Sequence, residues 1–493
     1  MSGIRVTYSG LINFAIGLIR IFTGLAFIII VTRLLSPEEF GTWNLIVGLI
    51  TYVMVLHHIV SYWVTREVAR DEKSGKTALL SSSIFSTIGI SIYLGITYFV
   101  VAQTPVEHNV LLFAVIIIPT QFFYSIISAI TLGWKPQATG YGIIIIDIVK
   151  IPVVLILLYY YEMGVIGVII SAAIATTASS VMLVIFSRNK IRGRINKNFL
   201  KNWLKLSWLP LIPSAVSIIS ALDVLIFTII VGSTEGLGYY SAAFVVASLA
   251  SYAASIAVGV YPKLLGDENK EYLQNIFTMF LYFLIPLGLM SIAFARPALY
   301  TLNPIYEIIA ITVIFLTLRM FLSTIFAVFS LFLKGIDKVD TRNSKFKDYR
   351  KSMLFKIPIL QFIKFSSYIG LLSTILLLST STSFIDLVLY WSILGFIIQI
   401  PFTIIVSYYV KKNFILKLEY FSVIKYLFSG IVAFGTAFLL AEEYLIYTPN
   451  IFHFLPSLLL FIGYSVGVYL LLTYFIDSNT RKLFNAIFNY IKN

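Results

Sequence analysis

The sequence predicts an all-α polytopic membrane protein, and three observations lead to this fold class. Of the 493 residues, 59% are hydrophobic and only 12% are charged, whereas soluble domains average about 45–50% and about 25%. The mean hydropathy is +0.94. Apolar runs of about 20 residues, the length that crosses a bilayer as a helix, recur along the whole chain.

We expect fourteen spanning helices in a chain that has no cysteine and no metal-ligand spacing among its four histidines. The first apolar run is too long for a cleavable signal peptide, so we expect it to remain as a helix. The expected spans are residues 9–32, 40–62, 78–102, 110–133, 140–160, 164–187, 206–231, 238–261, 276–298, 305–333, 357–380, 386–410, 426–446 and 454–476.

The basic residues orient these helices. With a cytoplasmic amino terminus, 30 of the 36 basic residues fall in inside segments and only Arg33 and Arg296 fall outside. The positive-inside rule requires this asymmetry, and a missed helix would destroy it. We therefore expect a multi-pass protein of the plasma membrane with both termini cytoplasmic. The net charge of +14 then requires no nucleic-acid partner.

A weak internal repeat predicts two lobes of six helices. Val31 and Val231 each follow isoleucines and precede a short acidic loop that ends at Gly41 or Gly238. The expected regions are an N-terminal lobe (1–190), a linker (191–205), a C-terminal lobe (206–410) and two further helices with an amphipathic tail (411–493).

The linker predicts an amphipathic helix on the anionic inner leaflet, with membrane lipids as partners. Seven basic residues lie between Arg188 and Lys205, interleaved with Phe199, Leu200, Trp203 and Leu204. Such a pattern places apolar side chains in the bilayer and lysines among the headgroups.

Arg20 lies almost at the middle of the first span. An arginine there costs roughly 2.5–3.5 kcal/mol on insertion scales, so such residues face a bundle interior or a water-filled cavity. At 100° per residue, Asn13 and Gly17 share its face. We interpret this polar stripe as a path for something anionic.

Arg319 occupies a similar polar stripe in the tenth span. Guanidinium groups offer bidentate donors to phosphate oxygens, so Arg20, Arg319, Lys150 and Asn13 are the candidate headgroup ligands. The alternative is that each arginine pairs with a buried acid such as Asp147 or Asp223 and locks helices together.

Four charged residues besides the arginines lie well inside expected spans. Asp147 and Lys150 are three residues apart and can neutralise each other on one helix face, unless a substrate phosphate competes for Lys150. Asp223 is an intramembrane carboxylate and a candidate for coupling through H⁺ or Na⁺. We expect Lys364 to extend to the cytoplasmic interface. No other cofactor and no metal are expected.

Polar residues at helical spacing in both halves predict a wet interior. Packing of helices through small polar residues is the alternative. The candidate cavity-lining residues are Asn44, Thr51, Ser248, Tyr252 and Gln399.

The loop Arg33-Leu-Leu-Ser-Pro-Glu-Glu-Phe-Gly41, the segment Glu235-Gly-Leu-Gly238-Tyr-Tyr and the fourteen spans resemble the polysaccharide-transporter (Wzx-type) family of the multidrug/oligosaccharidyl-lipid/polysaccharide exporter superfamily. The resemblance implies two lobes around a central cavity, alternating access and a working monomer. It also implies a substrate in which a polyprenyl (pyro)phosphate carries an oligosaccharide, with the choice between a dolichyl and an undecaprenyl carrier left open. Glycan-assembly enzymes are further candidate partners.

The sequence shows neither a complete phosphate-binding loop nor a long exterior loop, and this limits the classes of function to consider. Ser74-Gly-Lys-Thr77 ends like a phosphate-binding loop, but Arg70 stands where the first glycine belongs. The exterior loops are too short for a catalytic domain, so we do not expect an enzyme. We expect a transporter that flips a lipid-linked oligosaccharide to the exterior leaflet. The alternatives are a cation-coupled multidrug exporter of the same superfamily and a non-transporting scaffold for glycosyltransferases.

Overall fold

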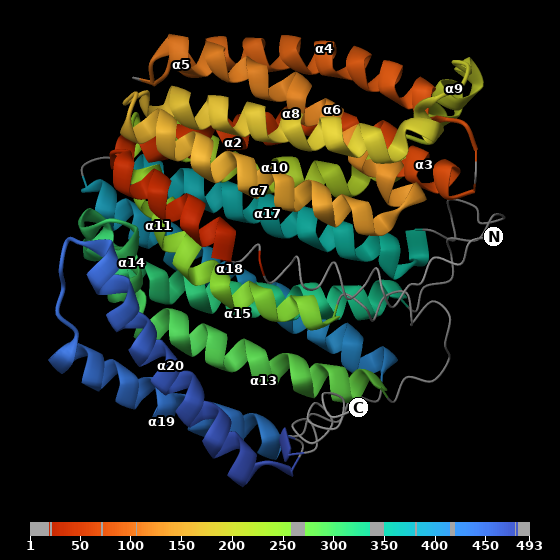
Figure 1. Ribbon diagram of the computed structural model, residues 1–493. Helices are drawn as coiled ribbons and strands as arrows, with labels where there is room; N and C mark the ends of the chain where they lie inside the picture. The colour runs from red at the N-terminus through yellow and green to blue at the C-terminus, as the bar shows by residue number, and fades with distance from the viewer. Residues whose placement is uncertain are drawn as a thin grey trace. The chain divides into compact units, whose positions relative to one another are not determined.

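The computed structural model describes residues 19, 22–70, 72–104, 106–257, 272–335, 350–379, 382–414, 420–478 and 480–481. Every regular element in these segments is helical (Figure 1). In the same segments, thirteen helices are long and apolar enough to cross a membrane, and Phe22–Leu34 is the described part of the expected first span. The predicted all-α, multi-pass architecture is confirmed.

The helices follow the expected spans closely. The largest difference is at α3, which runs to Ala69 where the sequence predicted an end at 62. In chain order the elements are α2 (Pro37–Met54), η1 (Val55–His57), α3 (His58–Ala69), α4 (Gly75–Val101), α5 (His108–Phe113), η2 (Ala114–Ile116), α6 (Ile117–Trp134), α7 (Pro136–Tyr159), α8 (Gly164–Ile191), α9 (Lys197–Lys205), α10 (Trp208–Val231), α11 (Glu235–Ala247), η3 (Ser248–Ala257), α13 (Tyr272–Ala293), α14 (Ala295–Leu302), η4 (Pro304–Ile309), α15 (Ala310–Gly335), α17 (Met353–Leu378), α18 (Phe384–Asn413), α19 (Tyr420–Tyr444) and α20 (Ile451–Ile476).

The chain divides into two compact units. Unit 1 comprises Met1–Tyr239 and Ile369–Phe384, and unit 2 comprises Tyr240–Tyr368 and Ile385–Asn493. The seventh span, α10, belongs to unit 1, where it packs on α2. The lobe boundaries drawn from the sequence stay a prediction.

Unit 1 is built around α8. Helices α4, α6 and α8 lie side by side, and α7 packs along α8 (Figure 1). Within a bilayer, close contact of small residues and hydrogen bonds replace the hydrophobic effect as the force between helices. The α7–α8 pair shows both, because the Ser179 hydroxyl donates to the Gly142 carbonyl at 2.8 Å.

Unit 2 has an aromatic core. Helices α13, α15 and α19 meet there, and α20 packs on α19. Polar aromatic tips find partners inside this core, as when the Tyr469 hydroxyl donates to the Tyr282 carbonyl at 2.8 Å. The buried rings include those of Phe277, Phe280, Phe332, Tyr426 and Tyr469.

The loop before α2 forms its helix cap. The Ser36 hydroxyl accepts from the Glu39 N–H, while the Glu39 carboxylate accepts from the Ser36 N–H, and Pro37 starts the helix. This reciprocal cap satisfies donors that the first turn leaves open. It fixes the direction in which α2 enters unit 1.

Candidate functional site

Arg319 lies half-buried near the middle of the span Pro304–Gly335, in α15. Its Nη1 donates to the Tyr240 hydroxyl at 2.9 Å and to the Tyr368 hydroxyl at 3.3 Å. The guanidinium carbon is 4.9 Å from the centre of the Tyr368 ring. The two phenol oxygens accept from the guanidinium and fix its orientation in α15.

A second layer holds the two tyrosines. The Trp391 indole N–H of α18 donates to the Tyr368 hydroxyl. The Tyr240 ring stacks on Trp391, with ring centres 3.7 Å apart and planes within 7°. Trp391 itself is fully buried. Supporting contacts of this kind fix the geometry of a binding side chain before a ligand arrives.

Gly395 provides the surface against which Arg319 lies. A Cβ at this position would be 2.7 Å from Arg319 Nη1 and 2.9 Å from its Cδ. Any larger residue would push the guanidinium from its place. The backbone of α18 thus defines one side of the arginine site.

Lys364 does not extend to the interface, so the sequence prediction for this residue was wrong. It lies 11 residues into α17, about 16 Å along the helix at 1.5 Å per residue, and only 7% of it is exposed. Its Nζ donates to the Gln399 side-chain oxygen at 3.0 Å. The ammonium also lies 4.2 Å from the Phe365 ring centre. Because an amide oxygen in α18 receives the ammonium, the side chain is held inside the protein.

Lys364 and Arg319 form one cationic cluster. Their contacts on α18 are one helical turn apart, because Gly395 lies against Arg319 and Gln399 receives Lys364. Gln399 is itself fixed, since its Nε2 donates to the Thr403 hydroxyl at 3.0 Å and that hydroxyl donates to the Leu322 carbonyl at 3.3 Å. Two cations on α15 and α17 therefore share a polar lining that α18 supplies. We call this set Arg319, Lys364, Tyr240, Tyr368 and Gln399 the cationic cluster.

Asp147 and Lys150 lie in unit 1, with Lys150 Nζ 3.9 Å from Asp147 Oδ1. The Thr23 hydroxyl donates to Asp147 Oδ2 at 2.6 Å. Lys150 Nζ also sits 3.9 Å from the centre of the Phe27 ring. The carboxylate and the ammonium thus connect α7 to Phe22–Leu34, and their assignment to coupling or headgroup binding stays a prediction.

Asp223 is buried in α10 and accepts the Val224 N–H at 2.9 Å. The Tyr52 hydroxyl, which donates to the Ala221 carbonyl at 2.6 Å, lies in the same region of α2 and α10. A coupling role for Asp223 stays a prediction.

Arg20 and Asn13 lie outside the described residues. Three of the predicted cavity-lining residues donate to a backbone carbonyl three or four residues earlier: Asn44 to that of Phe40, Thr51 to that of Val47 and Ser248 to that of Val245. Such local bonds are common for these residue types in helices. Tyr252 is 44% exposed. The lining role of these four residues stays a prediction, and Gln399 has the additional contact to Lys364.

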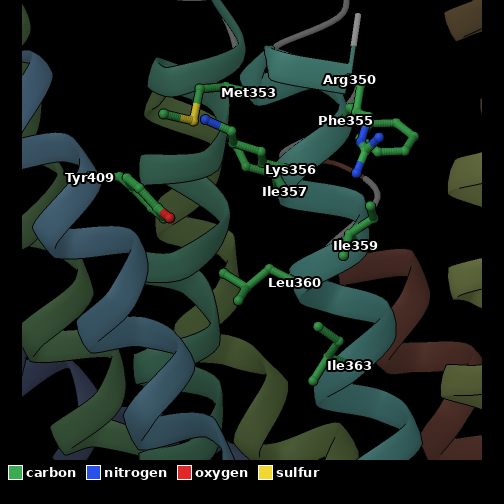
Figure 2. A pocket seen from close by; sticks show the side chains of 9 residues that line it. All are labelled: Arg350, Met353, Phe355, Lys356, Ile357, Ile359, Leu360, Ile363 and Tyr409. Carbon is green, nitrogen blue, oxygen red and sulfur yellow. The ribbon is translucent and has the colours of Figure 1, made fainter. Parts of the chain in front are cut away.

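A pocket of about 350 Å³ opens at the start of α17. Figure 2 shows Lys356 and Met353 on one side, Tyr409 reaching in from α18, and Leu360 further along α17. Arg350 is a second basic residue in its wall. Basic groups above an aliphatic floor match the chemistry of a phosphate joined to an apolar chain.

Comparison with known proteins gives both a family and a fold. A family model described as "Polysaccharide biosynthesis protein" matches residues 30–303. No curated protein sequence matches the chain.

Three solved structures share the fold. "Lipid II flippase MurJ, inward closed conformation" is 16% identical, covering 94% of this chain and 98% of that one, with a TM-score of 0.63. An inward-facing multidrug resistance MATE family transporter of the MOP superfamily is 14% identical, covering 82% and 98%, with a TM-score of 0.59. MATE in the straight conformation is 16% identical, covering 83% and 95%, with a TM-score of 0.53.

Proposed function

The chain belongs to the polysaccharide biosynthesis protein family, and from this premise we propose that it flips a polyprenyl-(pyro)phosphate-linked oligosaccharide from the cytoplasmic to the exterior leaflet. The family match covers more than half of the chain. The chain shares its fold with a lipid II flippase and with MATE transporters, and this likeness supports a transporter rather than an enzyme.

The observation that carries the proposal is the cationic cluster. Arg319 and Lys364 stand deep within spanning helices, where an unneeded charge is selected against because of its insertion cost. Guanidinium and ammonium donors bind phosphate oxygens strongly when both are desolvated. A headgroup that carries two phosphates would occupy both cations at once. We therefore assign the cluster to the (pyro)phosphate.

The pocket at the start of α17 supports the same assignment. It lies on the helix that also carries Lys364, at the end that the charge distribution assigns to the cytoplasm. Arg350 and Lys356 would meet the phosphate first, while Leu360 would contact the prenyl chain. Transport would follow alternating access. The protein would act as a monomer in the plasma membrane with both termini cytoplasmic.

A cation-coupled drug exporter is the second candidate, favoured by the MATE fold and by the buried acid Asp147. The two proposals predict different cargo. Proteoliposomes containing the intact chain should move a fluorescent polyprenyl-diphosphate oligosaccharide between leaflets, and should not expel a small organic cation against a proton gradient. The reverse result would establish the exporter, and movement of neither would favour a scaffold for glycosyltransferases.

A further inference from the structure

Helix α9 is tied to unit 1 by one edge of its apolar face. Trp203 is 1% exposed and its indole N–H donates to Glu67 at 2.9 Å. Phe199 stacks on Trp203, with ring centres 6.0 Å apart. At the start of the helix, the Asn196 N–H donates to the Thr77 hydroxyl at 3.0 Å. This part of the face, which the sequence predicted to enter the bilayer, is instead buried in protein.

The rest of the face borders a groove between α9 and α4. The groove has a volume of about 420 Å³, within the range of about 300–1,000 Å³ typical of ligand pockets. Its walls are mostly aliphatic, and Ile195, Leu204, Leu80 and Ile84 are each between 46% and 50% exposed. We call it the α4–α9 groove.

The groove is continuous with the lipid-facing surface of a spanning helix. Leu80 and Ile84 lie 5 and 9 residues after Gly75, where α4 begins, or about 8 and 14 Å along the helix axis. Because α4 is long and apolar enough to cross the membrane, exposed aliphatic side chains on it face acyl chains. The apolar floor of the groove therefore opens to lipid.

Basic residues line the other edge. Lys197 and Lys201, one turn apart on α9, line the groove and are exposed. The segment from Arg188 to Lys205 contains seven basic residues and no acidic residue. A phosphate at this edge would meet ammonium groups while its apolar chain lay along Leu80 and Ile84.

We propose that the α4–α9 groove binds an anionic phospholipid of the cytoplasmic leaflet, with its phosphate at Lys197 and Lys201 and one acyl chain between α4 and α9. The occupant is a bilayer lipid because the charge of the rim and the apolar floor complement the two parts of that molecule. The site is independent of the cationic cluster, since all of its residues lie in unit 1. The bound lipid would hold α9 at the membrane surface.

Native mass spectrometry of the full chain in detergent, titrated with phosphatidylglycerol or phosphatidylethanolamine, tests this proposal. Removing a lysine near an anionic headgroup lowers affinity about fivefold, so K197Q/K201Q should bind phosphatidylglycerol roughly thirtyfold more weakly. The control K411Q/K412Q removes the same charge at the end of α18 and should bind normally. Equal binding of the two lipids by the intact chain, or unchanged binding by K197Q/K201Q, would overturn the proposal.

A photoactivatable phosphatidylglycerol locates the site. In membranes, its acyl chain should label peptides that contain Leu80, Ile84 or Leu204, and Leu204→Asn should reduce this labelling severalfold without a change in charge. Labelling confined to other helices, or labelling of these positions that Leu204→Asn does not reduce, would contradict the groove. A partner polypeptide crosslinked through a photoreactive residue at position 204, in place of lipid, would likewise contradict it.

Discussion

Gly41 and Gly238 pack backbone to backbone in unit 1. A Cβ on Gly41 would lie 1.8 Å from the Thr234 carbonyl oxygen, and a Cβ on Gly238 would lie 1.9 Å from that of Pro37. The Thr42 and Thr234 hydroxyls meet beside this contact at 3.1 Å. The two glycines that mark the internal repeat in the sequence are therefore partners across one helix–helix contact.

Substitution of Gly41 by Ala should destabilise unit 1 strongly. No side chain can be accommodated 1.8 Å from a backbone oxygen, so α2 and α11 must separate, and overpacking of this type costs about 1–3 kcal/mol or more. Thermal unfolding in detergent should show a clearly lower midpoint temperature for Gly41→Ala than for the intact chain. Gly24→Ala is the matched control, since nothing lies within 4 Å of its Cβ; equal effects of the two would contradict this account of the contact.

Arg319→Gln should weaken binding of the diphosphate lipid by roughly 10- to 100-fold, because a hydrogen bond to a charged group contributes about 1.5–3 kcal/mol. Arg319→Lys should restore only part of the affinity, since one ammonium cannot reproduce the planar donor pair. Binding in nanodiscs measures both effects. Full affinity in Arg319→Gln, with the protein still folded, would remove Arg319 from the headgroup site.

Gly395→Ala should impair transport without removing any charged group. Its Cβ would displace the Arg319 guanidinium from a distance of 2.7 Å. The comparison is Gly435→Ala in α19, where no atom lies within 4 Å. Transport assays should show a severalfold lower rate for Gly395→Ala alone, and similar rates for both variants would show that the position of Arg319 is unimportant.

Gln399→Leu should destabilise the protein because it leaves the Lys364 ammonium without the carbonyl that now receives it at 3.0 Å. An unsatisfied buried polar group costs about 1–3 kcal/mol, and more when charged. Combining it with Lys364→Met should recover part of this loss. A double-mutant cycle of unfolding free energies measures the coupling, and additive losses would show that the two side chains do not support each other.

Asp477 should make folding sensitive to acid. Burial acts to raise the pKa of this carboxyl, but hydrogen bonds from Thr480, Tyr426 and Ser422 outweigh burial and lower it below its ordinary value of 3.8. The stabilisation is thus complete above the unfolded-state pKa and is lost as the pH falls through the lower folded-state pKa. Below about pH 4, the free energy of unfolding should fall more for the intact chain than for Asp477→Asn. Identical acid profiles would contradict this role.

Much of the fold was predictable because bilayer thickness sets the length of each apolar run locally along the chain. In the described part of the chain, thirteen spanning helices follow the second to fourteenth expected spans, and α3 exceeds its expected end where Trp203 of α9 packs against its last turns. That contact joins segments more than 130 residues apart, as the Trp203–Glu67 bond shows. The hydrophobic periodicity of one segment cannot predict a contact with a segment so distant in the sequence.

The candidate site was predictable only in part. The charge of Arg319 and its polar stripe were visible in the sequence, but its tyrosine partners lie on α11 and α17. The prediction for Lys364 was wrong because the expected span began at residue 357, close enough for a lysine to reach the interface, whereas α17 begins at Met353 and the contact with Gln399 on α18 holds the side chain inside. Gln399 itself was a candidate cavity-lining residue in the sequence, although this did not identify Lys364 as its partner.

The most direct test of the central claim is the rate of leaflet-to-leaflet movement of fluorescent polyprenyl oligosaccharides in proteoliposomes. The intact chain and R319Q/K364Q would be compared on lipids whose headgroup linkage is a diphosphate, a monophosphate or neutral. The cationic cluster predicts that the intact chain moves the diphosphate lipid fastest and that the double variant loses this preference while remaining folded. Equal rates for the neutral and diphosphate lipids, or an unchanged preference in the double variant, would contradict the assignment of Arg319 and Lys364 to the headgroup.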